Sequence, residues 1–352
     1  MRHGASREIA PGYAISRIVK GGWQLAGGHG PVHAEAAIAD MRRFADAGIT
    51  TFDCADIYTG VEALIGRFLS RYRREAGAAA AAAVKVHTKL VPDREDLARL
   101  RRADVERSVD RSRARLGLDT LDMVQLAWWD YDVPGWVDAA LHLVELQRRG
   151  KLRLIGATNF DTPRLAELLD AGVPLAAHQV QYSPVDRRPE RGMLELCRER
   201  GVALLCYGSL LGGLLSDRYL GGSEPEEPFE NRSLRKYALM IREFGGWERH
   251  QALLRALREV ADRHGASIAR VGLRWVLDRP GVAAAIVGAR HARHLEDVVA
   301  ALSLALDDAD RARIQAAVEG APGPGGDCFG LERVAGGPHA AIMRYDLNRE
   351  ST

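Results

Sequence analysis

The chain has 352 residues, of which 47% are hydrophobic and 27% charged, a composition typical of globular proteins. Its formal net charge of +2 and the lack of an apolar run of about 20 residues argue against nucleic-acid binding and against a membrane span. The segment Met1–Pro11 has no apolar core, and four scattered cysteines (Cys54, Cys197, Cys206 and Cys328) form no CxxC pair. We therefore expect a cytoplasmic protein with reduced thiols.

Short apolar segments alternate with amphipathic ones along the chain, which is the pattern of successive β-α units and a parallel sheet. The expected strands are Ile15–Gly21, Thr50–Asp53, Val84–Lys89, Met123–Ala127, Leu152–Ala157, His178–Gln181, Ala203–Tyr207 and Ala283–Val287. Eight strands in a chain of this length predict an α/β fold of the (β/α)8 TIM-barrel class, a single domain over residues 1–352.

Helices are predicted where apolar residues recur on one face. In the segment 61–69 they stand at i, i+3, i+4, i+7 and i+8, and similar stripes begin at Ile38 and at Leu253. Gly48 and Gly150 are expected helix stops.

Three stretches are expected to lie outside this repeat. Gly221–Pro228 is rich in glycine, proline and glutamate and predicts a loop insertion. Ala321–Gly326 is expected to separate a C-terminal tail, from about residue 321, from the barrel. The alanine run Ala76–Ala83 is interpreted as the end of a surface helix followed by a loop.

The active site of such a barrel lies at the C-terminal ends of its strands. There the second strand delivers Asp53, followed by Tyr58, and the third delivers Lys89. An ammonium beside a tyrosine lowers the pKa of the hydroxyl from its ordinary value near 10, and a paired aspartate holds the lysine. Such a tyrosine can act as a general acid toward a carbonyl oxygen. The spacing alone equally allows a buried ion pair beside a tyrosine packed on a helix.

Several sequence blocks resemble the aldo-keto reductase family, in the family's order. They are FDCADIYTGVEALIG (52–66), HTKL (87–90), LDTLDMVQLAWWDY (118–131), GATNF (156–160), HQVQYSPVDRRPE (178–190) and IVGAR (286–290). The resemblance covers roughly residues 13–302 and implies NAD(P)H-dependent reduction of a small-molecule substrate in a TIM barrel whose N-terminal segment closes the bottom. Consistently, no GxGxxG follows a strand, and Gly21–Gly30 has the wrong spacing for a Rossmann fingerprint.

The resemblance also implies roles for single residues. Asp53, Tyr58 and Lys89 match three members of the catalytic tetrad, with Tyr58 as proton donor, and Ala127 holds the fourth position. Thr158, Asn159 and Gln179 would bind the nicotinamide carboxamide, and Tyr207 would stack on its ring. The implied cofactor-binding positions are Gly22, Trp23, Thr158, Asn159, Gln179, Tyr207, Gly208, Ser209, Leu210, Gly212, Arg218, Arg232, Gly288, Arg290, His294 and Asp297. Trp23, Tyr58, Trp128 and Trp129 are the candidate substrate-binding residues, and packing of the barrel rim is the alternative for Trp128 and Trp129.

Ala127 departs from the family, which has a histidine there. Alanine cannot donate a hydrogen bond to the substrate oxygen, and loss of one such donor typically costs about 10²–10³ in rate. Three explanations remain open. The acceptor is unusual, such as a conjugated enone, since a steroid double-bond reductase of the family also lacks this histidine. The protein binds the cofactor with little turnover, as the potassium-channel β-subunits do. Or the alanine is an engineered knockout of an ordinary reductase.

Other histidines are expected to play no catalytic part. His87 shares a strand face with Lys89 one layer deeper and is interpreted as a packed core residue, while His29 and His33 stand near the pocket mouth. The basic cluster 290–294 favours NADP(H) over NAD(H), because arginine pairs well with a 2′-phosphate, although Val298 replaces a polar family residue. No metal-ligand spacing is present, and nothing in the sequence indicates an oligomeric state.

Overall fold

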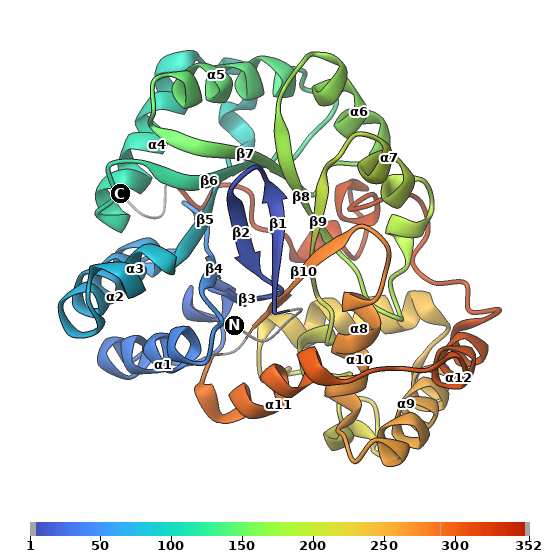
Figure 1. Ribbon diagram of the computed structural model, residues 1–352. Coiled ribbons are helices and arrows are strands. Elements are labelled where there is room, and N and C mark those ends of the chain that lie inside the picture. Colours follow the sequence, from blue (N-terminus) through green and yellow to red (C-terminus); the bar gives the residue numbers. More distant parts are fainter. Residues whose placement is uncertain (1–4, 289, 349–352) are drawn as a thin grey trace.

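A closed barrel of eight parallel strands forms the centre of the computed structural model, which describes residues 5–288 and 290–348 (Figure 1). The strands are β3 (Ile18–Gly21), β4 (Thr51–Asp53), β5 (Lys85–Leu90), β6 (Leu121–Leu126), β7 (Leu152–Thr158), β8 (Leu175–Gln181), β9 (Ala203–Tyr207) and β10 (Val282–Val287). They pair in chain order, and β10 closes the ring on β3 through Ala285 opposite Ile18. The predicted TIM-barrel class is therefore confirmed. Residues 1–4, Ala289 and residues 349–352 lie outside the described part of the expected domain.

Helices surround the barrel because nearly all of them turn an apolar face toward the core. They are α1 (Ala34–Asp46), α2 (Val61–Ala76), α3 (Ala78–Ala83), α4 (Arg102–Leu116), α5 (Trp136–Arg148), α6 (Thr162–Asp170), α7 (Met193–Glu199), α8 (Arg232–Phe244), α9 (Trp247–Arg263), α10 (Ile268–Leu277), α11 (Leu295–Ala300) and α12 (Asp308–Val318). The predicted stripe of α2 packs in one large cluster with β4 and α4, through Phe68, Phe52 and Val105. The stripes beginning at Ile38 and Leu253 likewise face the core, in α1 and α9.

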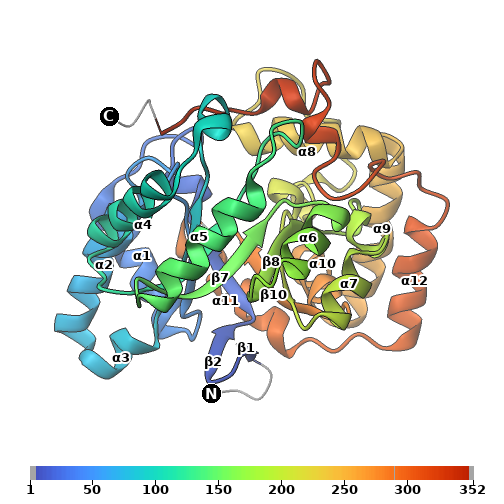
Figure 2. The same ribbon diagram turned by 90° about the horizontal axis from the view of Figure 1, so that it is seen from above.

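An N-terminal hairpin covers one end of the barrel. It consists of β1 (Ser6–Ala10) and β2 (Tyr13–Ser16), and its Tyr13 and Ile15 pack in a second apolar cluster with residues inside the barrel, such as Met123. The expected closure of the barrel bottom is thus present (Figure 2).

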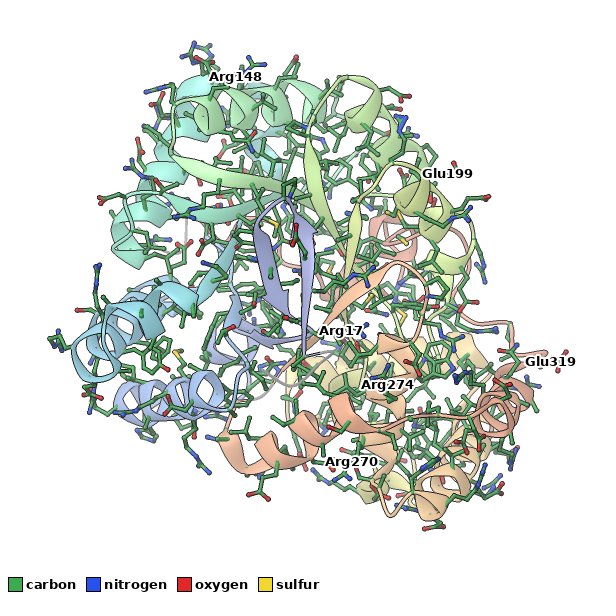
Figure 3. The ribbon with its side chains drawn as sticks, viewed as in Figure 1. Arg17, Arg148, Glu199, Arg270, Arg274 and Glu319 are labelled. Atoms are coloured by element: carbon green, nitrogen blue, oxygen red, sulfur yellow. The ribbon has the colours of Figure 1, made fainter. Side chains whose placement is uncertain are left out.

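The first expected strand, Ile15–Gly21, is in fact two strands. Its first residues belong to the hairpin and its last to the barrel, with the break at Arg17. The Arg17 side chain (Figure 3) donates hydrogen bonds to the carbonyl oxygens of Leu277 and Ala283, 2.5 and 3.3 Å away. These bonds join residues some 260 positions apart, so no local pattern indicates the break.

The alanine run is more helical than expected. Gly77, with φ +92°, separates α2 from α3, and the six alanines 78–83 form a helix rather than a loop. Alanine has the highest helix propensity, which accounts for the difference.

The C-terminal tail, defined here as residues 327–348, is not set apart from the barrel. After α12 the chain returns to the barrel face opposite the hairpin, where Figure 2 shows it above the strands. There the Tyr345 carbonyl accepts a hydrogen bond from the Arg94 backbone (3.1 Å), and Asn348 Nδ2 donates to the Val91 carbonyl (2.8 Å). The tail therefore forms part of the face that carries the candidate site.

Candidate functional site

Asp53 and Lys89 form a buried ion pair at the C-terminal ends of β4 and β5. Lys89 Nζ lies 2.6 Å from Asp53 Oδ2 and donates a second hydrogen bond to the Cys54 carbonyl, 2.7 Å away. Both side chains are 5% exposed. The Tyr58 ring lies beside this pair, with its centroid 5.2 Å from Nζ. The structure thus brings together the three residues that the sequence singled out.

Burial is the largest single influence on the pKa values of Tyr58 and Lys89. Burial raises the pKa of the Tyr58 hydroxyl, and the Lys89 ammonium opposes that rise without reversing it. Burial alone would lower the pKa of Lys89, but the Asp53 carboxylate outweighs it and the net pKa is raised. Lys89 thus acts on the pKa of Tyr58 in the expected direction, but burial has the larger effect. At neutral pH Tyr58 is a neutral hydroxyl beside a charged ammonium, which is the form of a proton donor.

Two glutamines complete the Asp53 environment. Asp53 Oδ1 accepts hydrogen bonds from Gln125 Nε2 at 3.0 Å and from Gln179 Nε2 at 2.6 Å, and Gln179 Nε2 also lies 3.1 Å from Gln125 Oε1. The sequence assigned no role to Gln125. The signal was available, because Gln125 is the polar residue two positions before Ala127 on a strand that is otherwise largely apolar.

Ala127 lies in an apolar environment. It directly follows β6, and its methyl group packs in one cluster with Ile57, Val91 and Leu347 of the C-terminal tail. Tyr58 and Trp129 pack against the same cluster. Ala127 is therefore close to Tyr58, and the side chains that share its cluster are apolar.

A donor and an acceptor for a primary amide stand at the ends of β7 and β8. Asn159 has the left-handed φ of +60°, and its Oδ1 accepts a hydrogen bond from the Tyr207 hydroxyl at 2.8 Å. Its Nδ2 and the Oε1 of Gln179 have no hydrogen bond among the described residues. This pair is complementary to a nicotinamide carboxamide, which needs one donor and one acceptor. Thr158 is buried, and its hydroxyl donates to the Gln179 carbonyl.

The loop after β3 approaches the site closely. The Gly22 N–H bonds the Asp53 carbonyl at 2.7 Å, and a Cβ on Gly22 would lie 2.9 Å from that oxygen. The Trp23 ring then lies against Tyr58, with centroids 5.2 Å apart, and His29 meets its other edge at 6.4 Å. His29 bonds the Ser233 hydroxyl of α8 at 2.8 Å, while His33 only precedes α1.

The segment after β9 has a left-handed backbone at two glycines that have no room for a side chain. Gly208 and Gly212 have φ values of +71° and +65°, and a Cβ on either would lie 2.8 or 2.9 Å from Tyr237. The neighbouring Ser209 is buried and bonds the Cys206 carbonyl, and Leu210 packs on the core. Such a glycine segment lets a ligand approach the main chain.

The expected cofactor cations are only partly gathered. Arg218 is 65% exposed and pairs with Glu230 at 2.8 Å. The Arg232 N–H bonds the Gly28 carbonyl at 3.4 Å. Arg290 donates to the carbonyl oxygens of His29 and Pro31. The loop after β3 therefore contacts two of the three arginines.

The remaining expected cofactor-binding positions, Gly288, His294 and Asp297, are spread along the chain segment after β10. A Cβ on Gly288 would collide with Gln24, which explains the glycine. His294 Nε2 accepts a hydrogen bond from Arg293 at 2.9 Å, and Asp297 pairs with Arg270 (Figure 3) at 2.7 Å. Val298 is buried.

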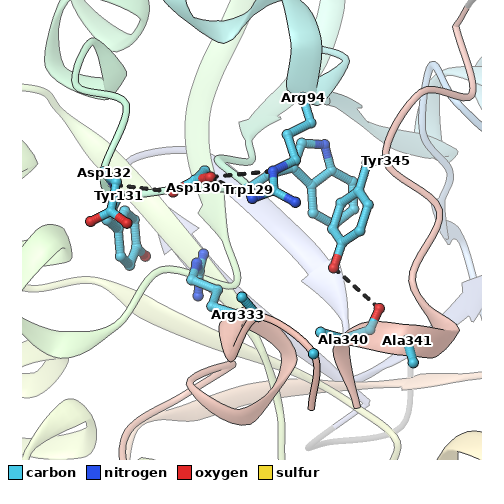
Figure 4. Close-up of a pocket in the computed structure, with 11 residues that line it drawn as sticks. Arg94, Trp129, Asp130, Tyr131, Asp132, Arg333, Ala340, Ala341 and Tyr345 are labelled. Carbon is cyan, nitrogen blue, oxygen red and sulfur yellow. Dashed lines mark hydrogen bonds and ion pairs between the residues drawn. The ribbon is translucent and has the colours of Figure 1, made fainter. Parts of the chain in front are cut away.

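The two tryptophans after β6 have different surroundings. Trp129 lines a cavity of about 350 Å³ on the C-terminal face of the barrel, together with Tyr131, Tyr345, Arg94 and Arg333 (Figure 4). Trp128 is 2% exposed and does not line it, because its indole N–H donates to the carbonyls of Asp130 and Val133 in its own loop. Packing of the barrel rim was the alternative to substrate binding for both tryptophans, and the surroundings of Trp128 fit this alternative.

The C-terminal tail adds charged residues that the sequence did not single out. Glu332 is buried and pairs with Arg188 at 3.0 Å and with Lys236 at 3.8 Å. These charges hold the pKa of Glu332 at about 2 against the effect of burial. Lys236 in turn lies 5.1 Å from the centre of the Tyr207 ring. Nothing in the local sequence signals these pairs, since Glu332 and Arg188 are 144 residues apart.

The remaining candidates fit a packed core. His87 is buried below Lys89, 3.3 Å from the Tyr13 hydroxyl, and burial lowers its pKa to about 4. The four cysteines are buried free thiols. Within residues 5–288 and 290–348, no group of three or more acidic, histidine or cysteine side chains could hold a metal ion. None of the helices in that part of the chain is long and apolar enough to cross a membrane.

Comparison with known proteins agrees with this architecture. The chain is 32% identical over 257 residues to flagellar radial spoke protein 5 of Chlamydomonas reinhardtii, covering 63% of this chain but only 48% of that protein. It is 27% identical to the NADH-specific methylglyoxal reductase of Escherichia coli, over 84% of this chain and 92% of the enzyme. A thermostable aldo-keto reductase, Tm1743, has a similar structure, with a TM-score of 0.70 and 27% identity over 89% of this chain and 99% of that one. The sequence pattern of the Aldo/keto reductase family matches residues 17–319, and the chain therefore belongs to this family of oxidoreductases.

Proposed function

We propose that the protein is an NADP(H)-dependent reductase that acts on the carbonyl or conjugated enone of a small organic molecule. The observation that carries this proposal is the buried Asp53–Lys89 pair beside Tyr58, at the same strand ends as the free amide donor of Asn159 and acceptor of Gln179. The nicotinamide, when bound, supplies the hydride. The carboxamide would be held by Asn159 and Gln179, and Tyr207 lies at the same place with its hydroxyl fixed on Asn159.

Tyr58 is the proposed proton donor. Its raised pKa keeps the hydroxyl protonated at neutral pH, and the Lys89 ammonium stabilises the phenolate that forms when the proton leaves for the substrate oxygen. Asp53 holds Lys89 in this position, and the glutamine contacts hold Asp53. The Trp23 ring on Tyr58 and the buried Ala127 cluster exclude water from one side of the hydroxyl.

NADP(H) is proposed over NAD(H) because Arg290 and Arg232 flank the loop after β3, where a 2′-phosphate could accept hydrogen bonds. The E. coli relative is named as specific for NADH, so the two cofactors need direct comparison. We also propose a cytoplasmic location, which the four free thiols support.

Cofactor binding with little turnover is the second candidate function. It is favoured by Ala127, which offers no hydrogen bond to a substrate oxygen. The apolar neighbours Val91 and Leu347 fit an alanine that is native to this protein rather than engineered. They also suit the apolar body of an enone.

The decisive assay follows the loss of NADPH and NADH absorbance with a panel of aldehydes, ketones and enones. The protein, Ala127→His and Tyr58→Phe are compared in parallel. A reductase with a native alanine reduces an enone, gains nothing there from Ala127→His, and loses the activity with Tyr58→Phe. Aldehyde reduction that appears only with Ala127→His, by about 10²-fold or more, indicates a cofactor-binding protein instead. Lack of affinity for both cofactors contradicts the proposal as a whole.

A further inference from the structure

The cavity on the C-terminal face of the barrel has aromatic walls and two cationic side chains. Trp129 and Tyr131 come from the chain after β6, and Tyr345 from the C-terminal tail (Figure 4). Arg94 and Arg333 enter the same cavity of about 350 Å³. Its size suits a small organic molecule.

The charge of Arg94 is already neutralised. Its Nη2 and Nε lie 2.7 and 3.2 Å from Asp130 Oδ2, a two-point contact that Figure 4 shows. Arg94 therefore offers little net attraction to an anion.

Arg333 differs, because its hydrogen-bond acceptors are all neutral. Its Nη2 donates to the carbonyl oxygens of Trp128 and Asn159, each 2.8 Å away, and its Nη1 donates to the Phe329 carbonyl at 3.2 Å. The guanidinium also lies 4.1 Å from the centre of the Tyr131 ring. Among the described residues no carboxylate lies within ion-pair distance of Arg333.

The acidic side chains around Arg333 have other partners. Glu332 pairs with Arg188 and Lys236, and Asp130 pairs with Arg94. The Asp161 carboxylate caps α6 by accepting the Arg164 N–H at 2.9 Å. Asp132, also on the cavity rim, is exposed, so solvent screens its charge.

A largely buried cation with no carboxylate in direct contact is costly for a protein. Burial accordingly lowers the pKa of Arg333, although a guanidinium remains charged at any physiological pH. Its Nε is buried with no hydrogen-bond partner, and one N–H of Nη1 is also left over. The carbonyls and rings fix the group in one orientation, so a binding anion would meet a cation already held in place.

The cavity is next to the candidate reaction centre. Trp129 lines the cavity and also packs against the apolar cluster of Ala127, as Tyr58 does. A ligand that extends along Trp129 can therefore reach from Arg333 toward Tyr58. We infer that Arg333 binds a carboxylate of the substrate, so that the preferred substrates are carboxylic acids with an aldehyde, ketone or enone across an apolar or aromatic body. This inference rests on the proposed reductase function.

The test compares a charged substrate, 4-carboxybenzaldehyde, with its neutral methyl ester, methyl 4-formylbenzoate, which differs from it by the charge and one methyl group. The protein should show a kcat/KM for the acid roughly 10-fold or more above that for the ester, since a charge-assisted hydrogen bond is worth about one factor of ten. Arg333→Gln should bring the ratio close to one by raising KM for the acid, with little change for the ester. The double variant Arg94→Gln/Asp130→Asn, which removes the neutral ion pair of the same cavity without leaving an unpaired carboxylate there, should leave the ratio unchanged.

A binding measurement separates failure of this inference from failure of the proposed function. Benzoate is titrated calorimetrically into the protein and the same variants with NADPH present, and no turnover is needed. Benzoate binding that is weakened by Arg333→Gln, and not by Arg94→Gln/Asp130→Asn, supports the site even if neither aldehyde is reduced. Equal kcat/KM for acid and ester, or benzoate binding that is absent or insensitive to Arg333→Gln, overturns the inference.

Arg333→Lys guards against a purely structural effect. Lysine keeps the charge but cannot bridge the carbonyls of Trp128 and Asn159 as the guanidinium does. If Arg333→Lys keeps part of the preference for the acid and Arg333→Gln loses it, the positive charge at this position contributes to binding of the carboxylate. Equal loss of the preference in both variants means that Arg333 only holds the two loops, which contradicts a carboxylate site.

Discussion

Lys89 combines a structural and a chemical role in one side chain. It neutralises Asp53 at a place that is 5% exposed, and it faces the Tyr58 ring. A buried ion pair adds little stability by itself, but removal of one partner leaves the other charge buried and unpaired. The two roles can be separated experimentally because Tyr58 has no hydrogen bond to the pair in this structure.

We expect Lys89→Met to lower the free energy of unfolding by about 3–5 kcal/mol, since the Asp53 carboxylate then lacks its cation. Tyr58→Phe should change this free energy by less than about 1 kcal/mol, because the ring packing is kept. Both variants should lose reductase activity. Urea denaturation and NADPH oxidation measure the two effects, and a Tyr58→Phe variant as unstable as Lys89→Met would contradict the separation.

At the scale of elements, the C-terminal tail is joined to the barrel by charge as well as by packing. Glu332 meets Arg188, which follows β8 and also pairs with Asp186, and Lys236 of α8. All but Lys236 of these side chains are at most 1% exposed, and Lys236 is 17% exposed. The tail thus compensates cations that belong to the barrel.

Glu332→Gln should therefore cost about 3–5 kcal/mol of unfolding free energy, because two buried cations lose a carboxylate. Glu259→Gln is the matched control. Glu259 pairs with Arg313 on the surface, where solvent screens both charges, so its loss should change the stability little. Chemical denaturation of both variants provides the comparison, and equal effects would show that the tail is held by packing alone.

The elements show which features a sequence can predict. The strands β9 and β10 were found within one residue because each is a short apolar run between polar turns. The break at Arg17 and the return of the tail were not predicted, because both depend on contacts between residues more than 140 positions apart.

In the candidate site, Asp53, Tyr58 and Lys89 can be predicted because they stand at or just after the ends of expected strands. No sequence pattern near Arg333 indicates that it lies in the cavity. The polar contacts of Gln125 depend on the barrel's register, which pairs Lys89 with Gln125.

At the scale of the whole molecule, three histidines are buried in separate parts of the fold. His87 contacts Tyr13, His178 contacts the Phe160 carbonyl and His250 contacts the Leu214 carbonyl. Burial lowers the pKa of each from 6.5 to about 4. The folded protein therefore keeps these imidazoles neutral where the unfolded chain would protonate them.

We expect stability to fall as the pH drops from about 6.5 to about 4, because over this range the unfolded chain binds protons that the folded protein does not. A pKa change from 6.5 to about 4 corresponds to about 3 kcal/mol for each histidine. Urea denaturation at pH 7, pH 5 and pH 4 measures this loss. His178→Gln should make the loss smaller, and an unchanged pH dependence in that variant would be contrary to this account.

The pairing of Glu332 with Arg188 also has a consequence for the order in which the protein is made. Arg188 is synthesised 144 residues before its partner, and two of the carbonyls that hold Arg333, those of Trp128 and Asn159, follow β6 and β7 and are made earlier still. Chains emerge from the ribosome N-terminus first, so the barrel strands are all available before the tail arrives. The face that carries the candidate site is therefore the last part of the molecule to assemble, and a nascent barrel with all eight strands still lacks the wall that the tail adds to this face.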